Sequence, residues 1–152
     1  MTSENITARP PRADAAQLDA LQDALSHTVD AHAGYEIMTE KAEPEFRSVP
    51  LKFRELHHQH ADRLAAAMVA LGGDPDRDGG LMSTVNKAVV SVRAFFDEID
   101  DDVMDNIRDG EEHVLESLAK AEAALPAGRY RDEVATMRTE LQALLEETAR
   151  RG

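Results

Sequence analysis

Residues 53–73, FRELHHQHADRLAAAMVALGG, decide the fold of this chain because they contain a complete helix signal and its end. Phe53, Leu64 and Leu71 return to one side of a helix at steps that fit 3.6 residues per turn. The Gly72-Gly73 pair then stops the helix, since glycine readily adopts the backbone conformation that ends one. Three of the chain's six histidines lie inside this segment, so the same helix also bears on function.

The same periodicity predicts three more helices around this segment. The quoted helix is expected to cover about 45–71, and the others about 13–42, 100–124 and 129–150. Helices are expected to end at Pro44 and at 126–128, and the short turns there connect neighbouring helices into two antiparallel hairpins. Pro50 leaves one start open: the second helix either begins again at Ser48 as its N-cap, or begins near Pro44 and bends at Pro50.

The connection between the two hairpins is long and partly helical. Apolar residues from Leu81 to Phe96 have helical spacing, and the acidic run Asp97–Asp102 favours a new helix start near Asp100. The sequence therefore predicts an all-α, antiparallel ferritin-like four-helix bundle with a long helical crossover between its second and third helices. Residues 1–12 are predicted to be a disordered N-terminal arm, and residues 13–152 the bundle domain.

Composition and charge make some kinds of binding partner unfavourable. The chain of 152 residues has the length of one domain, and its formal net charge of −13 disfavours nucleic acid and anionic membrane surfaces as partners. The absence of cysteine excludes disulfides and thiolate metal sites. No segment reads as a secretory signal or a membrane span, so we expect a cytoplasmic location. No phosphate-binding loop, dinucleotide-binding glycine motif or nucleophile elbow occurs, which disfavours nucleotide and hydrolase chemistry.

Side chains of the metal-ligand type converge at one depth of the predicted bundle. Each predicted helix carries at least one such side chain on or beside its apolar stripe. All of them lie at a similar number of residues from the bundle end that holds the first hairpin turn, and therefore at a similar depth. These residues are His32, Glu36, His57, His60, Glu111 and Glu140. Buried carboxylates are costly unless compensated, and a divalent metal ion bound by imidazole and carboxylate would compensate them. We predict these six as metal ligands and no residue as catalytic, whereas His27, His58 and His113 are expected at the surface.

Part of the sequence resembles a known family. The segment His60-Ala61-Asp62-Arg63-Leu64 and the following Leu71-Gly72-Gly73-Asp74-Pro75 resemble the second helix of bacterioferritins. The layout from Leu18 onward resembles still more closely the small bacterial ferritin-like bundles of uncharacterised function. Gly34-Tyr35-Glu36 in the first helix and Asp109-Gly110-Glu111 in the third support this resemblance.

The resemblance implies a di-iron or related carboxylate site, with Glu on the first and third helices and Glu-x-x-His on the second and fourth. Carried over by position, Glu36 and Glu111 match, and His60 is the histidine of the second helix. His57 replaces the glutamate of that motif, and no Glu-x-x-His occurs in the fourth helix, where Glu140 lies near the matching position. These departures favour a single divalent ion such as zinc, copper or iron over an oxo-bridged pair.

Two interpretations of this sequence remain open. In the first, the chain binds iron, zinc, manganese or copper and handles metal or oxidative stress, with at most a weak ferroxidase-type activity. In the second, the same side chains form a metal-free polar layer of His–Glu hydrogen bonds in a non-enzymatic interaction module. Its docking surface, in a homodimer for example, would include Phe95 and Phe96. In both, the core is expected to include Met68, Met104 and Met137.

Overall fold

The computed structural model describes residues 12–77 and 103–149, and the side chains of 103–105 are not described. Three predicted segments lie outside the described residues: all but residue 12 of the arm at 1–12, the crossover helix at 81–96 with Phe95 and Phe96, and the acidic run at 97–102. The core prediction for Met104 lies outside them too.

Four helices make up the described part of the chain. They are α2 (Ala15–Lys41), α3 (Ser48–Ala70), α5 (Val103–Ala124) and α6 (Arg129–Ala149). The described residues contain no strand. The prediction of an all-α four-helix bundle is therefore confirmed, and each predicted helix lies within a few residues of its observed bounds. No helix of the described residues is long and apolar enough to cross a membrane.

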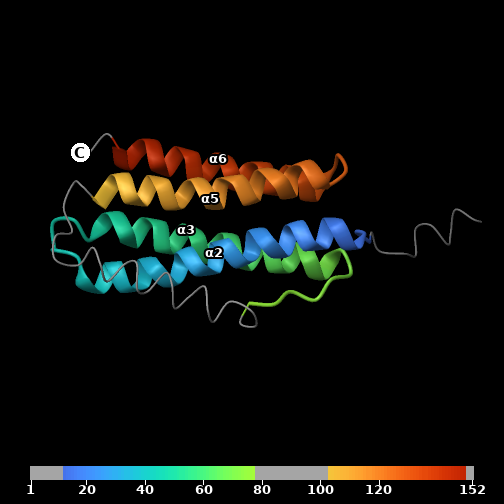
Figure 1. The fold of residues 1–152 in the computed structure, drawn as a ribbon, viewed down its shortest axis with the longest axis horizontal. Helices are drawn as coiled ribbons and strands as arrows, with labels where there is room; N and C mark the ends of the chain where they lie inside the picture. The colour runs from blue at the N-terminus through green and yellow to red at the C-terminus, as the bar shows by residue number, and fades with distance from the viewer. Residues whose placement is uncertain (1–11, 78–102, 150–152) are drawn as a thin grey trace, which may run out of the picture.

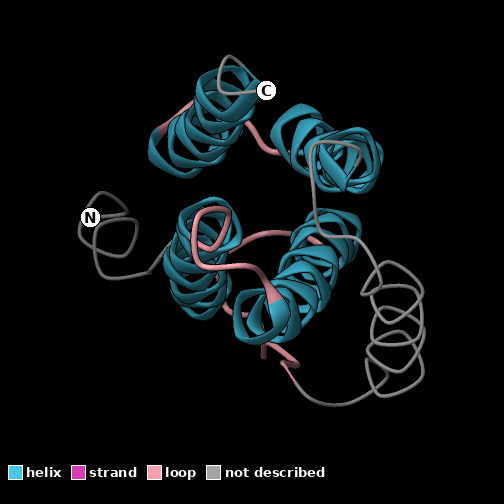
Figure 2. Ribbon diagram, turned by 90° about the vertical axis from the view of Figure 1, so that its left-hand side faces the viewer, coloured by secondary structure: helices cyan, strands magenta, loops and turns pink. Residues whose placement is uncertain are grey.

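The helices pack as two antiparallel hairpins. Helix α2 packs against α3 and α5, and α6 packs against α5 and α3. Figure 1 shows α2 running opposite to α3 and α5 opposite to α6, with α3 and α5 starting at the same end of the bundle. The view along the bundle in Figure 2 shows the four helices around a common centre. All four therefore present one side to a shared core.

The start of α3 settles the question that Pro50 left open. The helix begins at Ser48 after the turn at 44–47, and Arg47 rather than Ser48 occupies the N-cap position. Pro50 lies in the first turn, where backbone N–H groups have no partner inside the helix, so its missing N–H is tolerated.

The other bundle end is held by polar contacts between distant segments. Asp14 forms a capping box with Gln17 at the start of α2, and Gln17 also donates its side-chain N–H to the carbonyl of Ala124 at 3.1 Å. The backbone N–H of Ala13 donates to the carbonyl of Leu71 at 3.0 Å. These bonds connect the start of α2 to the ends of α3 and α5.

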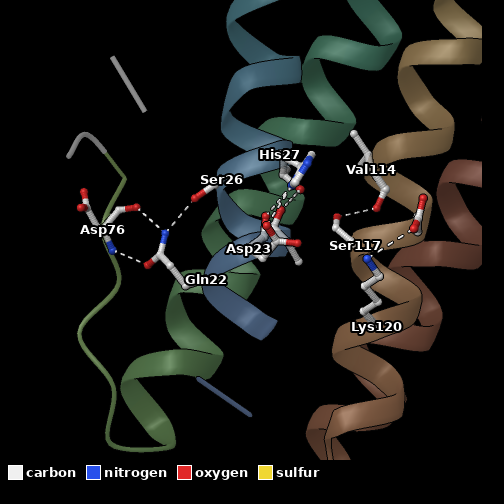
Figure 3. Close-up of polar contacts among 11 residues, drawn as sticks. Gln22, Asp23, Ser26, His27, Asp76, Val114, Ser117 and Lys120 are labelled. Carbon is white, nitrogen blue, oxygen red and sulfur yellow. Dashed lines mark hydrogen bonds and ion pairs between the residues drawn. The ribbon is translucent and has the colours of Figure 1, made fainter. Parts of the chain in front are cut away.

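The loop after α3 is fixed against α2 by one side chain. Gln22 donates to the Asp76 carbonyl at 2.8 Å and accepts from the Asp76 N–H at 2.8 Å, as Figure 3 shows. The turn before it needs glycine at Gly72, whose φ of +90° lies in the left-handed region. Gly73 is also constrained, because a Cβ atom there would lie 2.7 Å from the Leu18 side chain.

Aliphatic side chains fill the core. The side chains buried to 0% exposure are drawn from all four helices and include Leu21, Leu25, Phe53, Leu64, Leu118, Val134, Met137 and Leu141. Burying one such side chain fully stabilises the fold by about 1.5–3 kcal/mol. Met68 and Met137 belong to this core, as predicted. A few polar side chains share the same interior, and they form the candidate site.

Candidate functional site

Five polar residues cross the bundle interior at one level, and we call them the polar layer: Tyr35, His57, His60, Glu111 and Glu140. Tyr35 lies on α2, both histidines on α3, Glu111 on α5 and Glu140 on α6. His57 and His60 are three residues apart, so both rings leave the same side of α3. Every helix of the bundle therefore contributes to the layer.

Glu111 is the centre of the layer. Its side chain is buried, and its carboxylate accepts a hydrogen bond from the Tyr35 hydroxyl at 2.7 Å. The Nε2 atom of His57 lies 2.9 Å and 3.0 Å from its two oxygens. Tyr35 and His57 are its hydrogen-bond and ion-pair partners within the described part of the chain, and neither is a lysine or arginine. A buried carboxylate without a fixed positive partner is costly by several kcal/mol in effect.

Aromatic packing holds the donors of Glu111 in place. The rings of Tyr35 and Phe53 stack with centroids 5.1 Å apart, and those of Tyr35 and His57 stack at 5.6 Å. Stacked rings at these distances restrict each other's rotation. Burial, and secondarily the nearby Glu111, raises the pKa of Tyr35 well above its ordinary value, so the phenol stays protonated and donates.

The second half of the layer reaches the surface. The Nε2 atom of His60 lies 2.9 Å from a carboxylate oxygen of Glu140, which also accepts from Arg63 at 3.1 Å. His60 is buried, whereas the Glu140 side chain is 42% exposed. Burial lowers the pKa of His60, and the hydrogen bond to Glu140 opposes this change. The layer is thus closed at Glu111 and open to solvent at Glu140.

One nitrogen of each buried imidazole has no partner. The Nδ1 atoms of His57 and His60 are buried and make no hydrogen bond within the described residues. A protonated Nδ1 would leave a buried N–H group unpaired, which costs about 1–3 kcal/mol. Nε2 is therefore the nitrogen through which each ring pairs with its carboxylate.

The predicted ligands do not all meet. His57, His60 and Glu111 lie inside the bundle, as the sequence predicts, and Glu140 lies at its edge. The inward placement of Glu36 is wrong, because its side chain is 57% exposed. His32 is half-buried on the outer part of α2, where burial lowers its pKa, and its Nε2 atom lies 3.8 Å from Glu36.

The sequence interpretation missed Tyr35 because it placed the inward side of α2 too far round the helix. The buried positions Leu21, Thr28, Tyr35 and Ala42 repeat every seven residues, whereas the predicted stripe ran through Val29 to Glu36. One residue turns the helix by about 100°, so this difference exchanges Tyr35 for Glu36. The heptad spacing of Leu21, Thr28 and Tyr35 is the signal that identifies the inward side.

The layer is two His–Glu pairs rather than an assembled ion cage. Within the described residues, no group of three His, Asp or Glu side chains is arranged to hold a metal ion. The two pairs are nevertheless adjacent, since His57 lies close enough to His60 to influence its pKa. Two imidazoles and two carboxylates are therefore available within one turn of α3.

Comparison with known proteins identifies a family. Residues 16–124 match the family described as "Domain of unknown function (DUF2383)". The matched segment holds Tyr35, His57, His60 and Glu111, and it ends before α6 and Glu140. No curated protein and no solved structure matches the chain.

Proposed function

This chain belongs to the DUF2383 family, and we propose that it is a ferritin-like protein that binds one divalent metal ion in the polar layer. His57, His60 and Glu111 are the proposed ligands, and Glu140 is the ligand at the solvent side. The ferritin-like assignment is supported by the two antiparallel hairpins of Figure 1. Helix α3 ends and α5 starts at opposite ends of the bundle, which is the order of helix ends in a ferritin-like bundle.

The observation that carries the proposal is the burial of the Glu111 carboxyl group with no lysine or arginine beside it. Within the described residues, its partners are the Tyr35 hydroxyl and the His57 imidazole. A divalent cation bound there would supply a fixed positive charge. Carboxylate and imidazole together suit iron, manganese, zinc and copper, which matches the donors present.

The residues present fit a single ion better than a pair. Three ligands come from buried positions, and Glu140 offers an entry path because it is partly exposed. Ion binding would require the imidazoles to give up their direct hydrogen bonds to the carboxylates. Glu36, which the family resemblance implies as a ligand, points into solvent and does not fit. An iron or copper ion held here would supply one-electron chemistry, in keeping with a role in metal or oxidant handling.

One observation favours a second candidate, a metal-free layer in a non-enzymatic helical module. Each Nε2 atom already contacts its carboxylate at 2.9 Å, so the layer is satisfied at those atoms without an ion. In this reading the His–Glu pairs fix how the four helices align. The two candidates differ in a measurable way, because only the first predicts that stability depends on added metal.

The test compares wild-type protein with Glu111→Gln and with the control His113→Ala on α5. Purified protein is stripped with a chelator, and thermal unfolding is followed with and without Fe²⁺, Mn²⁺, Zn²⁺ or Cu²⁺. A ligand at a hundredfold excess over its Kd stabilises by about 2.7 kcal/mol, which corresponds to several degrees in Tm. With all three proteins compared in a His58→Ala background, wild-type and His113→Ala layers should show this rise, and the Glu111→Gln layer should not. Stripped wild-type protein whose Tm is indifferent to all four ions would overturn metal binding and leave the metal-free layer.

A further inference from the structure

A second group of ligand-type side chains lies on the outside of the α2–α3 hairpin. We propose that His32 and His58 form a surface site for a borderline divalent cation such as Zn²⁺, flanked by Glu36 and Asp62. The site uses no residue of the polar layer, although His57 of that layer lies near His32, and it does not depend on the function proposed for the layer. Neither His58 nor Asp62 was predicted as a ligand from the sequence.

The geometry brings two imidazoles together across two helices. The ring centroids of His32 on α2 and His58 on α3 are 5.6 Å apart, with the planes inclined by 39°. The His58 side chain is 56% exposed and His32 is half-buried, so the more exposed ring is free to turn toward the other. A shared ion needs such a turn, because metal–imidazole bonds are about 2.0–2.1 Å long.

Each imidazole has a carboxylate one turn further along its own helix. Glu36 lies 3.8 Å from Nε2 of His32, and Asp62 lies 3.6 Å from Nε2 of His58. The other oxygen of Asp62 accepts from Arg77 at 2.9 Å, which orients that carboxylate. As placed, these four side chains are not arranged around one point, so an ion would be held first by the two imidazoles once a ring turns. The carboxylates would then add oxygen donors or orient the rings.

Ordinary helix-surface pairing accounts for only part of this arrangement. A His and a carboxylate four residues apart often pair on an exposed helix, and His27 with Asp23 is such a pair at 3.5 Å. Pairing of this kind does not explain why two imidazoles meet between α2 and α3. Two protonated imidazoles at this distance would repel each other, whereas two neutral ones can share a cation.

The surface site and the polar layer can be altered independently. His57 and His58 are consecutive on α3, so their side chains leave the helix about 100° apart. The ring of His57 is buried against Tyr35 and Glu111, and that of His58 faces outward beside His32. A substitution of exposed His58 therefore leaves the packed interior unchanged.

The experiment is calorimetric titration of Zn²⁺ into the chelator-treated full chain. Relative to wild type, His58→Ala and His32→Ala should each lose one equivalent or weaken its Kd by about tenfold or more. His27→Ala removes an exposed histidine from an isolated His–Asp pair and should bind Zn²⁺ like wild type. The same number of equivalents and the same Kd in His58→Ala and wild type would overturn the surface site.

Glu111→Gln separates this inference from the function proposed for the polar layer. If the surface site exists, Glu111→Gln retains the equivalent that His58→Ala loses, whether or not the layer binds an ion. If Zn²⁺ binding survives His58→Ala and disappears in Glu111→Gln, the polar layer holds the ion and the surface proposal is wrong. Because His58 is exposed, circular dichroism of His58→Ala should match wild type.

Discussion

Tyr35→Phe is the sharpest test of the polar layer, because it removes one oxygen atom and leaves the stacked ring in place. The lost bond is a 2.7 Å hydrogen bond to a buried carboxylate, and bonds of this charged kind contribute about 1.5–3 kcal/mol. For a chain of this size, that loss corresponds to a Tm lower by about 3–12 °C. Thermal and urea unfolding followed by circular dichroism measure both quantities.

The matched control is Tyr130→Phe, at the start of α6. Tyr130 is half-buried outside the layer, packed against the core and beside the Arg129 side chain at 5.3 Å. Its hydroxyl makes no hydrogen bond within the described residues, so it is not expected to contribute. A Tyr35→Phe protein as stable as Tyr130→Phe, within about 0.5 kcal/mol, would refute the role assigned to the Tyr35–Glu111 bond.

Alkaline pH tests the same residue from another side. Burial and Glu111 raise the pKa of Tyr35 in the folded protein well above 10, whereas tyrosine in the unfolded chain ionises near 10. The unfolded chain therefore loses this proton first, and the stabilising contribution of Tyr35 is lost as pH rises above 10. Tyr35→Phe should show a shallower loss of stability than wild type above pH 10. Parallel curves for the two proteins would contradict a buried, protonated phenol.

Three further stability changes follow from single positions, each measured by thermal unfolding against wild type. Burial raises the pKa of Asp30 from 3.8 to about 6, so its contribution to stability is lost as pH rises through 6. Asp30→Asn should therefore raise Tm at pH 7 but not below pH 4. Equal gains in Tm at the two pH values would count against burial of the charge. Gly73→Ala should cost about 1 kcal/mol, because its Cβ would lie 3.2 Å from the Met68 carbonyl oxygen as well as 2.7 Å from the end of the Leu18 side chain. Its control, Gly110→Ala on α5, meets nothing within 4 Å and should gain about 0.5–1 kcal/mol. The opposite order would contradict the packing at Gly73. Asp14→Ala should cost about 1 kcal/mol through loss of the α2 capping box, and an unchanged Tm would rule that cap out as a stabilising contact.

Much of the fold was predictable because its signals are local. Helices end at Gly72, Gly73 and Pro126 because of local backbone preferences, which do not depend on tertiary contacts. Between such ends, apolar periodicity identifies the helices. The observed bounds of α3 and α6 follow from these signals within a few residues. The inward placement of His57, His60 and Glu111 was predictable for the same reason, since His60 and Glu111 lie on apolar stripes and His57 lies at the edge of one.

The rest of the site depended on contacts between helices, which periodicity does not describe. In α2, threonine and glycine weaken the contrast between the two sides, so the choice between Tyr35 and Glu36 depended on about 100° of helix rotation. What places Tyr35 inward is its packing against Phe53 and His57 on the neighbouring helix. The meeting of His32 with His58 is likewise a property of the pair of helices, and neither helix reveals it alone.

Because Glu140 is partly exposed and Glu111 is not, we expect water to reach His60 and His57 at different rates. Nε2 of His60 pairs with a carboxylate that water already reaches, so we expect solvent to reach this ring when Glu140 rotates. Nε2 of His57 pairs with a carboxylate that is itself enclosed, so we expect its contact with water to require a larger opening of the bundle. Protons or small ions would therefore enter the bundle between α3 and α6. They would reach His60 first and His57 last.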